Sequence, residues 1–188
     1  MTHKHNYLNN LRFKIFRFVL EIRDLIMPPR KLLGEINEIS AGAHVLDYGC
    51  GPGSYTIPAA QLVGASGRVY AADSNSLAIN EVAKRASKKG ITNIDTLLTD
   101  SIIRLTDASV DVIVLIFVLH EFKNPDLIIN ELDRVLKPKG ILVVKDNKLA
   151  NNKVIYMISQ ASGKLKLRNT GKQGEIEKSK TILFFSKE

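Results

Sequence analysis

The sequence predicts an α/β fold: a doubly wound, mostly parallel seven-stranded sheet with helices on both faces and an antiparallel C-terminal strand. Short apolar segments alternate with helix-like segments between residues 43 and 145, which is typical of βαβ units. The segment Val110–Val118 is an unbroken aliphatic run, as in a strand buried on both faces. The last two apolar segments are separated only by the polar loop Thr170–Gly174, which predicts a hairpin and hence the antiparallel edge.

The first elements in the chain follow from helical periodicity and proline positions. Apolar residues recur at helical spacing before Pro28, which ends a first helix, and Pro29 suits the first turn of a second. Gly90 follows the last helix of this half and suits its end. We expect helices at Leu8–Met27, Pro29–Glu38, Ser54–Val63 and Ser76–Lys89, and strands at Ala43–Tyr48 and Arg68–Ala72.

The later elements follow the same logic. A proline in its first turn supports a helix that begins at Pro125, and Lys137–Gly140 has the composition of a turn. We expect strands at Ile94–Leu98, Val110–Val118, Gly140–Lys145, Lys164–Arg168 and Thr181–Ser186, and helices at Pro125–Leu136 and Asn151–Ala161.

Length and composition limit the class of protein. The chain has 188 residues, 45% of them hydrophobic, which is enough for one packed domain. We divide it into an N-terminal helical extension, residues 1–31, and a domain, residues 32–188. Charges at Arg12, Lys14 and Arg17 interrupt the apolar start, so neither a secretory signal nor a membrane span is expected, and we predict a soluble cytoplasmic protein. Cys50 is the only cysteine, which excludes an intrachain disulfide and a thiolate metal cluster, and we predict no metal site.

A glycine-rich loop follows the first predicted strand. The segment Gly49-Cys50-Gly51-Pro52-Gly53 lies between the strand that ends in Asp47-Tyr48 and a helix that starts near Ser54. Glycines permit positive φ and let a ligand approach the backbone, and ligands of open α/β sheets bind at this edge. The spacing differs from the G-x-G-x-x-G of dinucleotide sites, because Ser54 stands where the third glycine belongs. The Gly-Lys-Ser/Thr of nucleoside triphosphate sites is absent.

This loop and several later segments resemble the class I S-adenosylmethionine-dependent methyltransferases. The resemblance covers about Leu32 to Glu188 and looks closest to the ubiquinone/menaquinone-biosynthesis branch and its small-molecule relatives. The matching segments are Asp47–Gly53, Val69–Asp73, Leu97–Ser101, Asp111–Phe122, Leu132–Leu142 and Leu183–Glu188.

The resemblance implies S-adenosylmethionine as cofactor and S-adenosylhomocysteine as product. It implies that Asp73 binds the ribose hydroxyls of the cofactor and that Asp100 lies near its adenine. It also implies that Asp47 is a hydrogen-bond acceptor for the ammonium group of the cofactor's amino-acid part. A carboxylate can accept two hydrogen bonds from a vicinal diol, which agrees with the role of Asp73. The full set of expected cofactor-binding residues is Asp47, Gly49, Cys50, Gly51, Gly53, Tyr55, Asp73, Ser74, Asp100, Ser101 and Phe117.

Catalysis needs a base if the acceptor loses a proton. His120 is the best-placed candidate, because it follows the fourth predicted strand at the carboxyl edge of the sheet and its type titrates near neutral pH. Glu121 comes next, and Asp146, at the end of the fifth strand, is a weaker candidate.

The acceptor and the partners are less constrained. We predict a small-molecule acceptor. The formal net charge of +8 leaves an RNA or protein acceptor as an alternative. It is not favoured, because no nucleic-acid module is appended and Phe117–His120 replaces the Asn/Asp-Pro-Pro-aromatic tetrapeptide of many amino-group methyltransferases. A non-catalytic cofactor-binding protein of the same fold is a third reading, and the oligomeric state is left open.

The N-terminal helix has several open roles. Its apolar stripe is wide enough to be buried somewhere. The helix can pack on the domain, form a lid over the substrate pocket, contact a membrane surface together with its basic residues, or meet a partner subunit. The stripe consists of Leu11, Ile15, Phe18, Ile22 and Leu25, widened by Phe16, Val19, Leu20 and Ile26.

Overall fold

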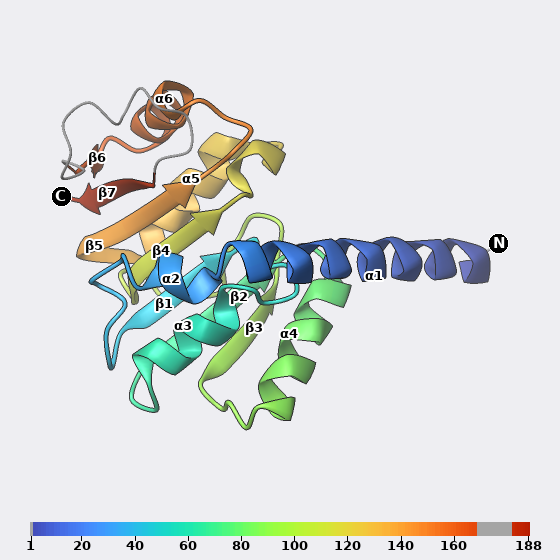
Figure 1. Ribbon diagram of the computed structural model, residues 1–188. Helices are drawn as coiled ribbons and strands as arrows, with labels where there is room; N and C mark the ends of the chain where they lie inside the picture. The colour runs from blue at the N-terminus through green and yellow to red at the C-terminus, as the bar shows by residue number, and fades with distance from the viewer. Residues whose placement is uncertain (1, 169–181) are drawn as a thin grey trace.

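A seven-stranded sheet in the order β3-β2-β1-β4-β5-β7-β6 forms the centre of the molecule (Figure 1). The computed structural model describes residues 2–168 and 182–188, with side chains from residue 9 onward. The first five strands pair in parallel, and β7 runs antiparallel to both β5 and β6, which confirms the predicted fold class. The strands are β1 (His44–Tyr48), β2 (Arg68–Asp73), β3 (Ile94–Leu98), β4 (Val110–Ile116), β5 (Leu136–Lys145), β6 (Leu165–Leu167) and β7 (Leu183–Lys187).

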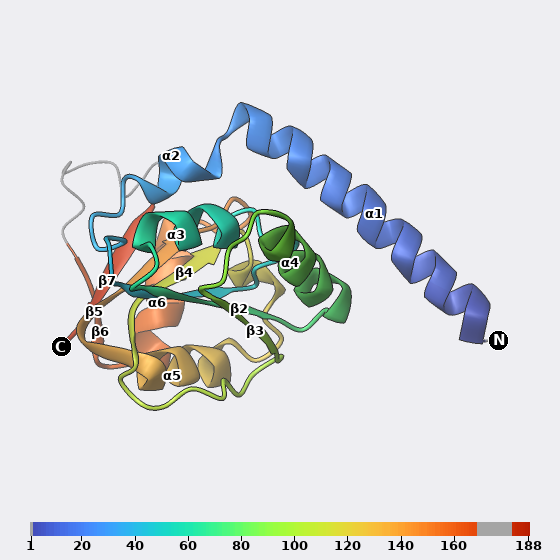
Figure 2. The same ribbon diagram turned by 90° about the horizontal axis from the view of Figure 1, so that it is seen from below.

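Helices cover both faces of this sheet, as Figure 2 shows with the sheet nearly edge-on. On one face lie α2, α3 and α4, and on the other lie α5 and α6. Each side has its own apolar core, because strands buried on both faces contribute side chains alternately to the two layers. The helices are α1 (Thr2–Ile26), α2 (Pro29–Leu33), α3 (Thr56–Val63), α4 (Ser76–Lys88), α5 (Pro125–Val135) and α6 (Asn151–Ala161), with the short 3₁₀ helix η1 (Leu119–Glu121).

Some predicted boundaries were wrong for identifiable reasons. The helix predicted for Pro29–Glu38 ends at Leu33, and the chain turns so that Ile36 and Ile39 reach the core. Strand β4 ends at Ile116 rather than Val118, because Phe117 adopts φ +60°.

The turn predicted at Lys137–Gly140 is instead part of a longer strand. Leu136 already pairs with Val110, and the irregularity is confined to a register shift and to Lys139, which has φ +65°. Thr181 and the loop Thr170–Gly174 lie outside the described residues.

Helix α1 projects from the domain, and its N-terminal half extends past α4 (Figures 1 and 2). Of the apolar stripe expected to be buried, only Leu20 is half-buried; the others are exposed, from 43% at Leu11 to 83% at Leu25. Within the described part of the chain, no helix is both long and apolar enough to cross a bilayer.

Candidate functional site

The glycine loop sits between the carboxyl ends of β1 and β2. Its three glycines all have positive φ, at +78°, +52° and +86°. The N–H groups of Gly49 and Cys50 donate to the carbonyl of Ala72 at 2.8 and 3.0 Å, which fixes the loop to β2. A Cβ on Gly49 would lie 2.3 Å from Cγ2 of Val118, so glycine is required there by space as well as by φ.

Asp73 at the end of β2 completes this connection. Its Oδ2 accepts a hydrogen bond from Gly51 N–H at 2.9 Å, and its Oδ1 accepts one from Asn75 N–H at 2.8 Å. A carboxylate has about four acceptor positions, so two remain open. Asn75 in turn caps α4 by accepting from Leu77 N–H.

A cavity of about 580 Å³ adjoins the loop. It brings together eight of the residues predicted to form the site. These are Gly49, Cys50, Gly51, Tyr55, Asp73, Ser74, Phe117 and His120. The cavity also reaches Ser54, whose buried hydroxyl has no hydrogen-bond partner among the described residues.

A second cavity, of about 350 Å³, lies beside the first and shares Gly49, Asp73 and Ser74 with it. Asp100 and Ser101 line it, as expected from their position after β3. Tyr48 lines it too, with its ring edge-on to Phe122 and its buried hydroxyl without a partner among the described residues. Burial raises the pKa of Tyr48 to about 12, so this hydroxyl stays protonated at neutral pH.

Two predicted residues do not line either cavity. Asp47 is only 2% exposed and lies beneath the loop, where its Oδ2 accepts a hydrogen bond from Thr56 Oγ1 at 2.6 Å. Burial raises the pKa of Asp47 to about 7, and the Thr56 hydrogen bond opposes this only in part. Gly53 packs against α4, where a Cβ would lie 3.1 Å from Cγ2 of Val82. Their roles toward a cofactor remain predictions.

His120 and Asp146 form a pair at the cavity wall. Nδ1 of His120 lies 2.9 Å from Oδ2 and 3.1 Å from Oδ1 of Asp146, and the backbone N–H of His120 donates to Oδ2 as well. Burial disfavours the charged form of Asp146, but hydrogen bonds from His120 and Lys148 outweigh it and keep the pKa of Asp146 below its usual value. An ionised Asp146 selects the tautomer that carries its proton on Nδ1, which leaves Nε2 as the basic atom.

The surroundings of Nε2 are compatible with proton transfer. Among the described residues it has no hydrogen-bond partner, and the nearest charge is Oε1 of Glu121 at 3.6 Å. The Glu121 side chain is 68% exposed, whereas Nε2 itself is buried.

Helix α1 forms the wall opposite the loop. Phe16 and Leu20 come within 4.0 Å of the place where a Cβ on Gly51 would be. The guanidinium of Arg23 lies 5.5 Å from the ring centre of Tyr55 and 5.6 Å from that of Phe117, within cation–π range.

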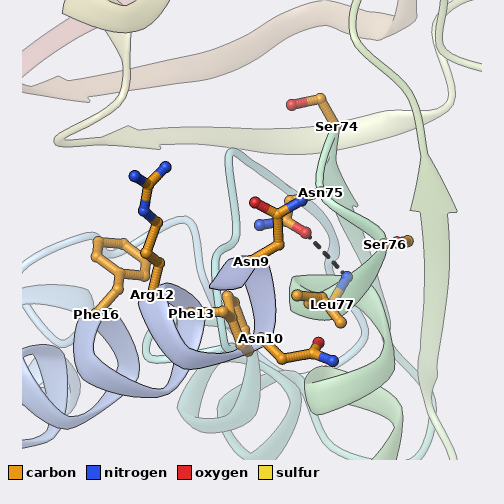
Figure 3. Close-up of a pocket in the computed structure, with 9 residues that line it drawn as sticks. All are labelled: Asn9, Asn10, Arg12, Phe13, Phe16, Ser74, Asn75, Ser76 and Leu77. Carbon is orange, nitrogen blue, oxygen red and sulfur yellow. Dashed lines mark hydrogen bonds between the residues drawn. The ribbon is translucent and has the colours of Figure 1, made fainter. Parts of the chain in front are cut away.

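Further along α1 a polar groove of about 740 Å³ separates its N-terminal part from the start of α4. Figure 3 shows Asn9, Asn10 and Arg12 on one side of the groove and Ser74–Leu77 on the other. The helix therefore borders the cavity that adjoins the glycine loop from Phe13 to Arg23, and the polar groove continues from Phe13 and Phe16 toward its N-terminal end.

Sequence reasoning missed some residues of the site. Tyr48 and Ser54 flank the glycine loop, and their buried unpaired hydroxyls identify them only once the fold is known. The α1 residues were not assigned because their neighbours lie far away in the chain.

The comparisons agree with this geometry. The model of the family described as "Methyltransferase domain" matches residues 39–182. A ubiquinone/menaquinone biosynthesis C-methyltransferase of Hydrogenovibrio crunogenus is 35% identical over 112 residues, 58% of this chain and 44% of that protein. A demethylmenaquinone methyltransferase of Lactobacillus johnsonii is 30% identical over 122 residues, 64% of this chain and 50% of that protein.

A solved structure extends the likeness over most of the chain. A SAM-dependent methyltransferase from Aquifex aeolicus superposes with a TM-score of 0.75 and 27% identity, covering 86% of this chain and 90% of that one. The fold and the arrangement of the site are thus those of a class I methyltransferase domain. The chain belongs to the methyltransferase domain family. It spans half or less of the length of the curated relatives it matches.

Proposed function

We propose that this protein transfers the methyl group of S-adenosylmethionine to a small organic acceptor that loses a proton from carbon, oxygen or nitrogen. The observation that carries the proposal is the pairing of the buried Asp146 with His120, which lines the same cavity as the glycine loop. A nucleophile activated beside a bound methyl donor is what such a transfer requires.

The residues around the two cavities fit S-adenosylmethionine. The two open acceptor positions on Asp73 suit the ribose hydroxyls. The unpartnered hydroxyl of Ser54, just before α3, suits the amino-acid carboxylate. Asp100, in the second cavity, suits the exocyclic amine of adenine. When bound, S-adenosylmethionine supplies an electrophilic methyl group on a sulfonium sulfur.

The chain's own residues then have distinct tasks. His120 accepts at Nε2 the proton that the acceptor loses, and Asp146 holds the imidazole in that orientation and stabilises its charged form. Phe16 and Leu20 of α1 lie over the loop and exclude water from the reacting groups.

A small acceptor is supported by the apolar wall of the cavity and by the relatives. Phe16, Leu20 and Met27 give the cavity an apolar wall on the side of α1. Several relatives are named for small acceptors, among them a demethylmenaquinone and an aklanonic acid methyltransferase. The acceptor proposed here therefore combines an apolar body with one acidic C–H, O–H or N–H group.

The test is a turnover assay with S-adenosylmethionine and a panel of phenols, enols and amines, with S-adenosylhomocysteine release as the readout. We expect turnover of at least one class and a loss of roughly 10²–10⁴-fold in His120→Ala. His44→Ala is the matched control, because His44 lies at the amino end of β1, on the opposite edge of the sheet. Full turnover by His120→Ala would refute the base, and methylation of RNA without turnover of any small acceptor would refute the substrate class.

A further inference from the structure

Helix α1 has two faces with different surroundings. Its inner face lines the cavity beside the glycine loop through Phe13, Phe16 and Leu20, and Arg17 on it forms an ion pair of 3.0 Å with Glu81 of α4. Its outer face is apolar and uncovered. The outer face consists of Leu11, Ile15, Phe18, Val19, Ile22, Leu25 and Ile26, each at least 43% exposed.

The outer face is continuous. At 3.6 residues per turn its seven side chains fall within an arc of about 120°, and no polar residue of α1 from Asn9 onward falls within that arc. Such a contiguous apolar surface on a protein marks a contact with a partner.

The spacing within the face identifies the kind of partner. Leu11, Ile15, Phe18, Ile22 and Leu25 follow one another at intervals of four, three, four and three residues. This is the heptad seam along which two helices pack side by side. The residues that face the domain lie on the opposite side of the helix, and no residue from 9 to 168 or from 182 to 188 covers the seam.

The edges of the seam determine the direction of that second helix. One edge carries Val19 and Ile26 with Arg12 at its end, and the other carries Lys14 and Glu21. In an antiparallel pair each edge meets its own copy, so Val19 meets the second copy's Val19 and Arg12 lies beside the second copy's Ile26. On the other edge, Lys14 of each copy meets Glu21 of the other. A parallel pair would instead place each charged edge against an apolar one.

We propose that two copies of this chain associate through an antiparallel pairing of their α1 helices about a two-fold axis at Phe18. In this register Leu11 is level with the second copy's Leu25, and Ile15 lies within one residue, about 1.5 Å, of the level of the second copy's Ile22. The interface is isologous, as in most homodimers.

The rest of the molecule permits this arrangement. Figure 2 shows the whole domain on one side of α1, so the two domains lie on opposite sides of the helix pair. An anionic lipid surface is the competing occupant of the seam. Glu21 at its edge lies 3.4 Å from Arg17 of the same helix and is still 53% exposed, so it opposes an anionic surface but matches Lys14 of a second copy.

Cysteine cross-linking tests the register. The one native cysteine, Cys50, is buried and does not interfere. Under mild oxidation we expect Phe18→Cys to form a disulfide-linked dimer roughly tenfold or more faster than Leu11→Cys, because the helix pair holds the two introduced thiols together at the two-fold axis. Residue 11 lies about 21 Å along the helix from residue 25, so Leu11→Cys alone cross-links slowly, whereas a mixture of Leu11→Cys and Leu25→Cys cross-links at a rate near that of Phe18→Cys.

Sedimentation of the wild type across a range of concentrations provides the second measurement. We expect a concentration-dependent dimer that Lys14→Glu weakens and that the double variant Lys14→Glu/Glu21→Lys restores. Equal cross-linking rates at positions 11 and 18 would overturn the proposal. So would a monomer at all concentrations, with or without binding to phosphatidylglycerol vesicles.

Discussion

Gly51 and Asp73 are joined by a hydrogen bond of 2.9 Å from the backbone N–H of the glycine to Oδ2 of the carboxylate. The bond connects the glycine loop to the end of β2, the two elements that meet at the carboxyl edge of the sheet. The same carboxylate also holds the start of α4 through Asn75 N–H. Asp73 therefore shapes the site and, with its two open acceptor positions, is free to bind a diol.

Substitutions of Asp73 test its role in binding the cofactor. We predict that Asp73→Ala weakens S-adenosylmethionine binding by roughly 100-fold, because two charge-assisted hydrogen bonds are lost. Asp73→Asn keeps one acceptor oxygen, so we expect its affinity for S-adenosylmethionine to lie between those of the wild type and of Asp73→Ala. Asp95→Ala is the control, because Asp95 is a half-exposed carboxylate on β3 that pairs with Arg68. Isothermal titration calorimetry provides the affinities, and an unchanged affinity in Asp73→Ala would refute the ribose assignment.

A substitution at Gly49 tests the packing of the glycine loop against Val118. We predict that Gly49→Ala destabilises the protein by more than the ~1–2 kcal/mol expected for an L-residue at positive φ. The excess arises because the new Cβ would lie 2.3 Å from Val118.

Gly90→Ala supplies the comparison. Gly90 has φ +65°, but a Cβ there meets nothing within 4 Å, so only the conformational cost applies. Urea unfolding measures the free energy of unfolding of both variants. The double variant Gly49→Ala/Val118→Ala should regain part of the stability that Gly49→Ala loses beyond Gly90→Ala. Equal losses in the two single variants would contradict the steric argument.

Asp47 gives a pH dependence of stability. Burial raises its pKa from 3.8 to about 7, so between about pH 4 and pH 7 the folded protein holds a proton that the unfolded chain has released. Folding then takes up a proton, and this group favours folding less as the pH rises through that window. Well above pH 7, the free-energy cost of burying the ionised Asp47 carboxylate is fully present and no longer changes with pH.

Asp47→Asn removes this cost and keeps an oxygen that accepts from Thr56 Oγ1. We therefore expect the variant to be more stable than the wild type at about pH 8, on the order of 1.4 kcal/mol per unit of pKa shift. The gap should close toward about pH 4.5. Thermal unfolding followed by circular dichroism measures both, and a gap that does not change with pH would show that Asp47 is ionised throughout.

Asp146 acts through His120. We predict that Asp146→Asn lowers kcat by roughly 100-fold while the Kd of S-adenosylmethionine changes little, because the imidazole loses its orientation rather than a ligand contact. Circular dichroism is the control for folding, since Asp146 also accepts from Lys148 and Leu149 N–H. A parallel loss in kcat and cofactor affinity would point to a structural role instead.

The sequence was sufficient to predict the fold and the edge of the sheet where the site lies. Gly49, Asp73 and Asp100 each follow a parallel strand, and the carboxyl ends of such strands meet at one edge of the sheet. This is why residues about 25 positions apart in the chain were predicted to meet and line adjoining cavities.

What the sequence did not predict depends on register and packing. The pairing of His120 with Asp146 requires β4 and β5 to align so that Ile116 lies beside Lys145, which no local pattern reveals. Asp47 was expected at the ligand, but the chain places its carboxyl beneath the loop against Thr56. The outward orientation of the α1 stripe likewise depends on contacts with α4, which lies more than fifty residues away in the chain.

The most direct test of the account is calorimetric titration of the folded wild-type protein with S-adenosylmethionine and S-adenosylhomocysteine. Membership of the methyltransferase domain family and the fit of the two cavities predict saturable binding of both compounds at one site per chain, with Asp73→Ala much weaker. The absence of binding to the folded wild type would contradict the central claim, whatever the acceptor.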